Sequence, residues 1–302
     1  MILPKRVKIV EVSPRDGLQN EAQLISADLK IQLIDLLVEA GVSFIEAGSF
    51  VNPKWVPQMA NSDIVFAGIR DAKNVNFSAL VPNLRGFERA MEAGVKEVSI
   101  FTSASESFSK KNTNCSIQES LARFTPVLKS AVDEKIPIRA YISCIAGCPY
   151  EGAINATKVA VLANELYQMG CYEISLADTT GVGTPDIICQ AIEKVSAKVP
   201  VDSIAGHFHD TYSQALVNIY AALTMGVSIF DSSVSGLGGC PYVKNSDKYK
   251  APGNIATEDL IYMLNGLDIK HNINLNRLIK AGLFISKKLG KMSGSKVSAA
   301  LT

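Results

Sequence analysis

Features that mark several classes of protein are missing from this chain of 302 residues. Lys and Arg (30) nearly balance Asp and Glu (29), and no block of basic residues stands out. The charge pattern therefore gives no reason to expect a nucleic acid or an anionic membrane as a partner. No uninterrupted apolar stretch approaches the roughly 18 residues that a transmembrane helix requires.

Targeting segments and a disulfide framework are also missing. The first residues, Met1–Arg6, lead directly into a strand-like run, with neither an apolar segment nor an amphipathic leader rich in Arg and Ser. The six cysteines are scattered and form no C-x-x-C pair, so we expect reduced thiols in the core or near a site. These features predict a soluble cytoplasmic enzyme.

What the chain does contain is one repeated unit: a short apolar strand, a polar loop, and a helix that ends at glycine. Gly41, Gly94, Gly170 and Gly226 end four such units, and a new strand follows each. A glycine in this place is typical of the left-handed residue that terminates a helix. The repeat indicates parallel strands joined by helices.

This rhythm predicts eight strands, most of them continuous apolar runs, as expected when both faces are covered. They are Lys8–Val12, Phe44–Gly48, Asn76–Val81, Glu97–Phe101, Ile138–Cys144, Tyr172–Ala177, Ile204–His209 and Ile229–Val234. Eight unbroken alternations favour the α/β class and closure into a (β/α)8 TIM barrel. An open, doubly wound parallel sheet is the alternative.

Helical periodicity occupies the segments between the strands. The predicted helices are Leu29–Glu39, Leu84–Ala93, Ile117–Ala131, Thr157–Met169, Asp186–Val195, Gln214–Met225 and Thr257–Leu264. An extra C-terminal helix, Asn276–Met292, is expected to pack on the barrel or to contact a second copy in a homodimer. The polar tail Ser293–Thr302 is expected to fray. No linker divides the chain, so we predict a single catalytic domain over residues 1–302.

Polar residues collect at the ends of the predicted strands, where the loops of a parallel barrel form its functional face. They are Arg15 and Asp16 after the first strand, Glu46 on the second, Asp178 at the end of the sixth, His207 and His209 on the seventh, and Cys240 in a glycine-rich loop after the eighth. We therefore place the functional site at this end of the barrel.

Two of the three histidines, His207 and His209, lie two residues apart on one strand, so their imidazoles point to the same face. A lone histidine is most often a core residue, as we expect for His271, but a pair at a strand end indicates a metal site. With Asp16 and an amide or water, the pair gives nitrogen and oxygen ligands that suit Mg²⁺ or Mn²⁺, with Fe²⁺ and Co²⁺ as alternatives.

The remaining polar residues are candidates for the chemical step and for its support. A fixed guanidinium at Arg15 stabilises developing enolate charge, although a surface salt bridge is the alternative. Glu46 and Asp178 would hold Arg15 and the histidines in orientation. The glycine-rich loop indicates that Cys240 is delivered to the substrate rather than to the metal. Asp210 either orients a histidine or caps the next helix.

Several stretches resemble the 3-hydroxy-3-methylglutaryl-CoA lyases, which belong to a wider group of metal-dependent TIM-barrel lyases and synthases. They are Val10–Glu21, Ser49–Met59, Gly236–Tyr242 and Gly253–Asp259. The resemblance extends from about residue 8 to about residue 265. The Arg-Asp-Gly and His-x-His pieces occur throughout the wider group, whereas the loop Gly236–Tyr242 is much more specific to the lyases.

The resemblance implies retro-Claisen cleavage of (S)-3-hydroxy-3-methylglutaryl-CoA, an acyl-CoA substrate, into acetyl-CoA and acetoacetate. It implies these metal ligands: Asp16, His207, His209 and Asn254. It also implies that Arg15 stabilises the thioester enolate, that Glu46 supports Arg15, and that Cys240 transfers a proton. We place the general base at His207, with Asp16 as the alternative.

Other functions remain as alternatives. A related Claisen synthase or a 4-hydroxy-2-oxo acid aldolase would share the metal ligands, although a synthase usually needs a further domain and an aldolase would not need the Cys240 loop. A barrel without catalytic activity, used for binding, is the alternative from another class. Lys54, Lys110 and Lys111 lie on loops at the same end and would either meet the CoA phosphates or remain solvated.

Overall fold

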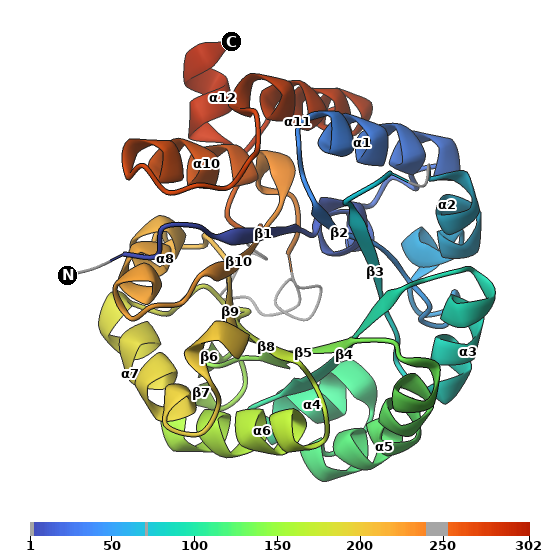
Figure 1. The fold of residues 1–302 in the computed structure, drawn as a ribbon, viewed down its shortest axis with the longest axis vertical. Coiled ribbons are helices and arrows are strands. Elements are labelled where there is room, and N and C mark those ends of the chain that lie inside the picture. Colours follow the sequence, from blue (N-terminus) through green and yellow to red (C-terminus); the bar gives the residue numbers. More distant parts are fainter. Residues whose placement is uncertain (1–2, 70–71, 240–252) are drawn as a thin grey trace.

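Eight parallel strands close into a barrel in the computed structural model, which describes residues 3–69, 72–239 and 253–302 (Figure 1). The order around the barrel is β1, β10, β9, β8, β5, β4, β3 and β2. Their bounds are β1 Lys8–Glu11, β2 Phe44–Ser49, β3 Asn76–Leu80, β4 Glu97–Ser103, β5 Ile138–Ser143, β8 Glu173–Asp178, β9 Ile204–Phe208 and β10 Ile229–Ser232. All eight predicted strands are therefore present, and no bound differs from its prediction by more than two residues.

Pairing of the first and last strands decides between a barrel and an open sheet. β1 pairs with β10 from Lys8 and Ile229 to Glu11 and Ser232, and it pairs with β2 on its other side. Neither side of β1 is left as an open edge. The fold is a TIM barrel of the α/β class, as predicted, and the open sheet is excluded.

Helices surround the barrel on its outside (Figure 1). They are α1 Ala27–Glu39, α2 Ser62–Gly68, α3 Leu84–Glu92, α4 Glu106–Thr113, α5 Ile117–Glu134, α6 Ala156–Gln168, α7 Pro185–Ser196, α8 Ala215–Thr224, α10 Thr257–Gly266, α11 Leu275–Lys288 and α12 Lys296–Leu301. Short helical turns are η1 Ser13–Gly17, η2 Pro57–Met59, η3 Val201–Ser203 and η4 Val234–Gly236. The extra C-terminal helix is α11, which packs beside α1.

Glycine ends the helices at the four predicted places. Gly41, Gly94, Gly170 and Gly226 have φ values of +93°, +78°, +107° and +88°, in the left-handed region that only glycine adopts without strain. In each case a barrel strand begins within a few residues. The prediction of parallel strands joined by glycine-terminated helices is confirmed.

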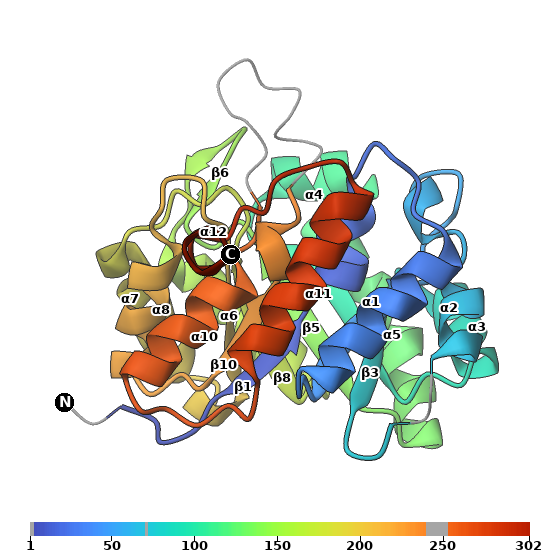
Figure 2. The same cartoon turned by 90° about the horizontal axis from the view of Figure 1, so that it is seen from above.

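The structure contains elements that sequence periodicity did not predict. Two short helices, α2 and α4, interrupt the loops after β2 and β4, and a two-stranded hairpin, β6 (Gly147–Cys148) with β7 (Gly152–Ala153), follows β5. Figure 2 shows β6 and α4 at one end of the barrel and the N-terminus at the other. These elements thus extend the face that carries the carboxyl ends of the strands.

The expectation that the tail frays is wrong. Residues 296–301 form α12, which Ser295 caps by accepting a hydrogen bond from the backbone N–H of Ser298 at 2.9 Å. Ser295 and Ser298 are both buried. The polar composition of the tail reflects hydrogen bonding to the protein rather than exposure to solvent.

A chain of alternating charges runs through the interior of the barrel. Lys8 Nζ lies 2.9 Å from Glu173 Oε2, and the other oxygen of Glu173 accepts a hydrogen bond from Arg139. Arg139 in turn binds Asp231 through both terminal nitrogens, at 2.6 and 3.1 Å. Glu173, Arg139 and Asp231 are each at most 2% exposed. Each buried charge has a partner of opposite sign, and this pairing offsets the cost of removing the charged side chains from water.

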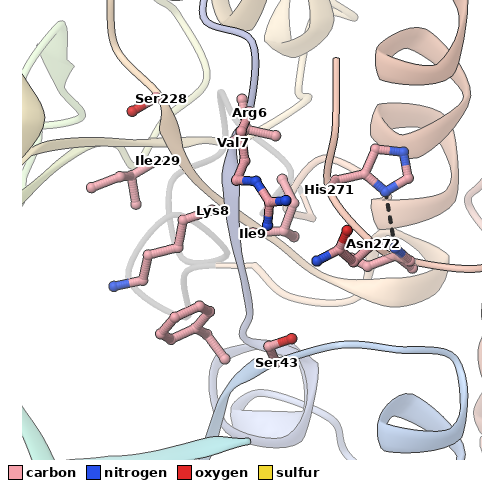
Figure 3. A pocket seen from close by; sticks show the side chains of 11 residues that line it. Arg6, Val7, Lys8, Ile9, Ser43, Ser228, Ile229, His271 and Asn272 are labelled. Carbon is pink, nitrogen blue, oxygen red and sulfur yellow. Dashed lines mark hydrogen bonds between the residues drawn. The ribbon is translucent and has the colours of Figure 1, made fainter. Parts of the chain in front are cut away.

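A cavity of about 350 Å³ opens at the amino ends of the strands (Figure 3). Arg6, Lys8 of β1 and Phe44 of β2 line it. His271 also lines it, and its Nε2 lies 2.9 Å from Asn265 Oδ1. This histidine was expected in the core, but it is half-buried at the wall of this cavity. Among the described residues, no helix is both long and apolar enough to cross a membrane.

Candidate metal and active site

The turn η1 places Arg15 and Asp16 at the carboxyl end of β1. The turn is tied to the loop after β10 because the buried carboxylate of Glu11 accepts hydrogen bonds from the backbone N–H groups of Ser13 and Val234, both at 3.0 Å. The position of the two functional side chains is therefore fixed by the strand that precedes them and by the loop opposite.

His207 and His209 lie at the carboxyl end of β9, where they are 5% and 4% exposed. Their Nε2 atoms are 3.3 Å apart, and His207 Nε2 lies 3.9 Å from Asp16 Oδ2. One ligand atom from each of the three residues lies within 4.8 Å of the other two. Lone pairs this close repel one another unless a cation or a proton lies between them, so this cluster is suited to a metal ion.

The tautomer of His207 supports the same conclusion. Its Nδ1 lies 3.0 Å from Asp231 Oδ2, and the Asp231 carboxylate also binds Arg139. Burial raises the pKa of Asp231, but the charge of Arg139 and the hydrogen bond of His207 outweigh it and hold the pKa well below its ordinary value. An ionised carboxylate can only accept, so Nδ1 of His207 donates, and Nε2 is the ring nitrogen left to bind a metal ion.

Asn254 adds an amide to the cluster. Its Nδ2 donates to Asp16 Oδ2 at 2.8 Å and to the Leu237 carbonyl at 3.1 Å. Its Oδ1 is buried and has no hydrogen-bond partner within the described part of the chain. A buried carbonyl oxygen is rarely left unsatisfied, and amide oxygen is a ligand that Mg²⁺ and Mn²⁺ accept. The nitrogen and oxygen donors present here thus fit a hard divalent metal.

Arg15 is buried beside these ligands and is held on two sides. Its Nε and Nη2 bind Glu46 Oε2, and its Nη1 lies 2.7 Å from Asp16 Oδ1. The other oxygen of Glu46 accepts a hydrogen bond from Ser99, and the guanidinium carbon lies 5.5 Å from the centre of the Tyr141 ring. The predicted contact between Glu46 and Arg15 is therefore present, and the surface salt bridge is excluded.

The charges of the site keep both Arg15 and Asp16 ionised. Burial lowers the pKa of Arg15, but Glu46 and Asp16 raise it above its ordinary value. Burial raises the pKa of Asp16, yet Arg15 and the two histidines bring it below its ordinary value. The positive charge of Arg15 therefore lies beside the ligand cluster, which suits a site that stabilises a developing oxyanion.

Asp178 and Asp210 have other partners than a site histidine in the described contacts. Asp178 Oδ2 accepts a hydrogen bond from the Gly183 backbone N–H at 2.8 Å, which holds the loop after β8. The carboxylate that orients His207 is that of Asp231, not Asp178. Asp210 Oδ1 accepts a hydrogen bond from the Ala215 backbone N–H at 3.0 Å, at the start of α8. Of its two predicted roles, Asp210 has the helix cap.

The remaining predicted site residues are Cys240 and three lysines. Cys240 lies outside the described residues. Lys54, Lys110 and Lys111 are exposed, and Lys111 Nζ lies 4.3 Å from the centre of the Tyr150 ring. Lys54 lies in the loop after β2, as predicted, whereas Lys110 and Lys111 lie in α4 rather than in a loop.

Asp231 and Arg139 are the functional residues that the sequence analysis missed. Both lie inside predicted strands, and each is the one charged residue of its strand. That contrast is a usable signal, because a charge in a buried strand needs a partner inside the barrel. The partner itself, His207, follows only from the register in which Asp231 of β10 pairs with His207 of β9.

Cys148 of the β6–β7 hairpin differs from the other thiols. None of the described cysteines forms a disulfide bond. Hydrogen bonds from Cys144 and Ser105 lower the pKa of Cys148 to about 6, although burial acts in the opposite direction. The Ser105 hydroxyl lies 3.0 Å from its sulfur. Burial raises the pKa of Cys171 to about 12. The thiolate is the reactive form, so the two cysteines should react very differently near neutral pH.

We expect alkylation of Cys148 by iodoacetamide to rise with pH through about 6, while Cys171 stays unmodified at neutral pH. Mass spectrometry of peptides alkylated between pH 5 and pH 8 measures both. Ser105→Ala removes one hydrogen bond to the thiolate and should move the Cys148 profile to higher pH. A Cys148 profile centred near pH 9 in the unchanged protein would contradict this account.

Fold and cluster together define a class: a TIM barrel whose strand ends bring two histidines, an aspartate and an asparagine amide to a metal-type cluster beside a buried arginine. A family model described as HMGL-like matches residues 6–285. The chain belongs to this family.

Individual relatives agree with this assignment. A 3-hydroxy-3-isohexenylglutaryl-CoA/hydroxy-methylglutaryl-CoA lyase of Pseudomonas aeruginosa is 56% identical over 301 residues, which are 100% of this chain and 99% of that protein. A crystal structure of hydroxymethylglutaryl-CoA lyase from P. aeruginosa matches with a TM-score of 0.96 and 56% identity, covering 100% and 99% of the two chains. An HMG-CoA lyase from Acinetobacter baumannii, in complex with coenzyme A and 3-methylmalate, matches with a TM-score of 0.93 and 35% identity, covering 100% and 97%.

Proposed function

We propose that this chain is a carbon–carbon lyase that cleaves (S)-3-hydroxy-3-methylglutaryl-CoA into acetyl-CoA and acetoacetate. The observation that carries the proposal is the convergence of Asp16, His207 and His209 to within 4.8 Å beside the buried Arg15. The names of the relatives support the acyl-CoA substrate, and one of their structures contains coenzyme A.

The metal ligands in this proposal are Asp16, His207, His209 and Asn254. Asp16, His207 and His209 have converging ligand atoms, and the buried amide oxygen of Asn254 has no hydrogen-bond partner among the described residues. A bound Mg²⁺ or Mn²⁺ would supply Lewis acidity toward the substrate hydroxyl and carboxylate. The donor set contains no thiolate, which favours these hard metals over a structural zinc ion.

Residues of the chain then carry the proton and charge transfers. A base takes the proton of the tertiary hydroxyl, the C2–C3 bond breaks to give acetoacetate, and the electron pair becomes the enolate of acetyl-CoA. Arg15 stabilises the enolate oxygen, and Cys240 returns a proton to the enolate carbon. Glu46 fixes the guanidinium through the contact described above.

The base is His207 or Asp16. Nδ1 of His207 already lies in a hydrogen bond with Asp231, so only Nε2 can accept a proton, and that atom faces the ligand cluster. An oxygen of Asp16 retains lone pairs even while the carboxylate contacts Arg15 and Asn254. This difference favours Asp16, which the sequence analysis kept as the alternative.

Metal dependence gives the most direct test. We expect acetoacetate and acetyl-CoA to form from (S)-3-hydroxy-3-methylglutaryl-CoA, to disappear after treatment with EDTA, and to return when Mg²⁺ or Mn²⁺ is added. Coupled enzymatic assays of both products measure this result. A Claisen synthase or an aldolase would not release acetoacetate, and protein that stays fully active after metal removal would refute the ligand assignment.

A second substrate is worth the same assay. The P. aeruginosa relative carries 3-hydroxy-3-isohexenylglutaryl-CoA in its name, and it is 56% identical over the whole of this chain. We propose this longer acyl-CoA as the alternative substrate. Comparison of kcat/KM for the two compounds decides which one the site prefers.

We also propose three broader properties that the sequence predicts. They are a single catalytic domain over residues 1–302, a homodimer and a cytoplasmic location. Light scattering of the purified protein tests the dimer, and fractionation of the source cells tests the location. Contact of Lys54, Lys110 and Lys111 with the CoA phosphates also belongs here, and charge-removing substitutions of these exposed lysines would raise KM for the acyl-CoA.

A further inference from the structure

The tail of the chain packs against the turn η4, which begins the loop after β10. The backbone N–H of Gly294 donates to the Ser235 carbonyl at 2.9 Å, and the Ser293 hydroxyl lies 3.0 Å from the Ser235 hydroxyl. Ser235 thus meets residues at the far end of the sequence. We call residues 293–301 the C-terminal segment.

Three backbone segments approach here more closely than side chains allow. A Cβ on Gly294 would lie 2.8 Å from the Ser235 carbonyl oxygen, and a Cβ on Gly253 would lie 1.9 Å from the Gly236 carbonyl oxygen. Glycine is therefore required at both positions for the observed packing. The contact is built into the backbone, which distinguishes it from a casual surface contact.

Asp259 anchors the C-terminal segment at a second place. Its carboxylate accepts hydrogen bonds from the Ser295 hydroxyl at 2.6 Å and from the backbone N–H groups of Lys296 and Val297 at 3.2 and 2.9 Å. These N–H groups belong to the first turn of α12, where a carboxylate is favourable. Ser235 thus holds the segment at Ser293 and Gly294, and Asp259 holds it at residues 295–297.

Ser235 is held in a conformation that it would not adopt alone. It has φ of +59° although it is not glycine, and it is buried. Its backbone N–H contacts both oxygens of Glu258, at 3.0 and 2.9 Å, and its hydroxyl lies 2.9 Å from that of Ser286. A serine in the left-handed region is strained and persists only where its surroundings impose that conformation.

The turn leads directly to the cluster of metal ligands. Two residues after Ser235, the Leu237 carbonyl accepts hydrogen bonds from the Asn254 backbone N–H at 3.4 Å and from its Nδ2 at 3.1 Å. The same Nδ2 reaches Asp16 at 2.8 Å. The orientation of the Asn254 amide therefore depends on where η4 holds Leu237, and this orientation sets the position of Asn254 Oδ1.

We infer that the C-terminal segment positions the metal site: through Gly294 and Ser293 it fixes the η4 turn, whose Leu237 carbonyl orients the Asn254 amide. The inference rests on the proposed function in one respect, that Asn254 is a metal ligand. The segment itself contributes no ligand, so Gly294 and Ser293 are positioning residues.

Gly294→Ala is the main test, and Gly266→Ala is its matched control. A Cβ on Gly266 at the end of α10 meets nothing within 4 Å, whereas one on Gly294 displaces the tail or the turn. We expect the Kd for Mn²⁺ to rise about tenfold or more in Gly294→Ala, the range seen when groups that orient metal ligands are removed. The control should match the unchanged protein. Electron paramagnetic resonance of free Mn²⁺ measures Kd without reference to turnover.

Ser293→Ala provides a second variant in case Gly294→Ala does not fold, and Ser196→Ala is its control. Ser293 contributes one hydroxyl contact to Ser235, whereas exposed Ser196 only binds the Glu193 carbonyl of its own helix. We expect a smaller rise in the Kd for Mn²⁺ for Ser293→Ala and none for Ser196→Ala. Saturating Mn²⁺ should restore most of the turnover in the positioning variants.

Asn254→Ala separates failure of this inference from failure of the proposed function. If Asn254→Ala leaves the Kd for Mn²⁺ unchanged, the ligand assignment is wrong. If Asn254→Ala weakens Mn²⁺ binding but the folded Gly294→Ala and Ser293→Ala proteins bind Mn²⁺ normally, the ligand assignment stands and the positioning role is overturned. A lower melting temperature with normal Mn²⁺ affinity at 25 °C also overturns it, because that result is a stability effect alone.

Discussion

Arg15→Lys lowers kcat by about 10²–10³, the usual loss when one well-placed stabiliser of an oxyanion is removed. The guanidinium is buried and is held by Glu46 on one side and by Asp16 on the other. Lysine keeps the charge but cannot form this planar fork, so its ammonium would not stay where the enolate oxygen forms. The defect should appear in kcat more than in KM, because the enolate exists only after the bond has broken.

Steady-state kinetics at saturating Mn²⁺ measure the Arg15 effect, with Mn²⁺ binding determined on the same protein. Arg89→Lys is the matched control, since that guanidinium lies over the Phe50 ring, 5.5 Å from its centre, rather than beside the metal cluster. Glu46→Gln should change kcat in the same direction by a smaller factor, because Arg15 loses the charge that orients it. Near-normal turnover of Arg15→Lys would remove Arg15 from the mechanism.

Asp231→Asn is expected to weaken Mn²⁺ binding about 10–100-fold, because Asp231 orients the ring of His207, one of the proposed metal ligands. The carboxylate accepts hydrogen bonds from Arg139, from Ser175 at 2.9 Å and from His207 at 3.0 Å. An asparagine offers one oxygen and places an NH₂ group against these donors. The buried guanidinium of Arg139 would also lose a charge partner, which costs about 3–5 kcal/mol in comparable sites.

Isothermal titration of Mn²⁺ and urea unfolding measure the two consequences of Asp231→Asn separately. Asp202→Asn, at an exposed position of η3, is the control and should change neither quantity. Ser175→Ala removes one neutral donor and should cost about 1 kcal/mol of stability with little effect on Mn²⁺ binding. Unchanged Mn²⁺ affinity in a folded Asp231→Asn protein would show that His207 does not depend on this carboxylate.

The barrel and most of the site could be predicted because both follow from local patterns. A glycine after a helix, as at Gly41 or Gly170, ends the helix wherever the chain folds, and eight alternations of strand and helix have few architectures to adopt. Parallel strands bring their carboxyl ends together, so Asp16 meets His207 and His209 although it lies far from them in the sequence. These predictions need the direction of each strand but not its register.

What could not be predicted depends on register or on partners at long range. Asp231 lies beside His207 only because β9 and β10 pair in one register. The tail has the composition of a solvated segment, yet Asp259 and Ser235 satisfy its polar groups. Asp178 stands at the end of a strand as expected, but its carboxylate binds the loop that follows. Composition identifies which groups need hydrogen bonds and does not identify what provides them.

Pairing of β1 with β10 has a consequence for how the protein is made. The contact between Asn254 and Asp16 spans 238 residues, and the strand that closes the barrel is the last of the eight to leave the ribosome. A nascent chain therefore carries Asp16 long before the other proposed ligands have been synthesised, and the proposed metal site can form only after translation is nearly complete. Contacts of such long range slow folding, so the half-made barrel must keep its open strand edges from pairing with other chains in the meantime.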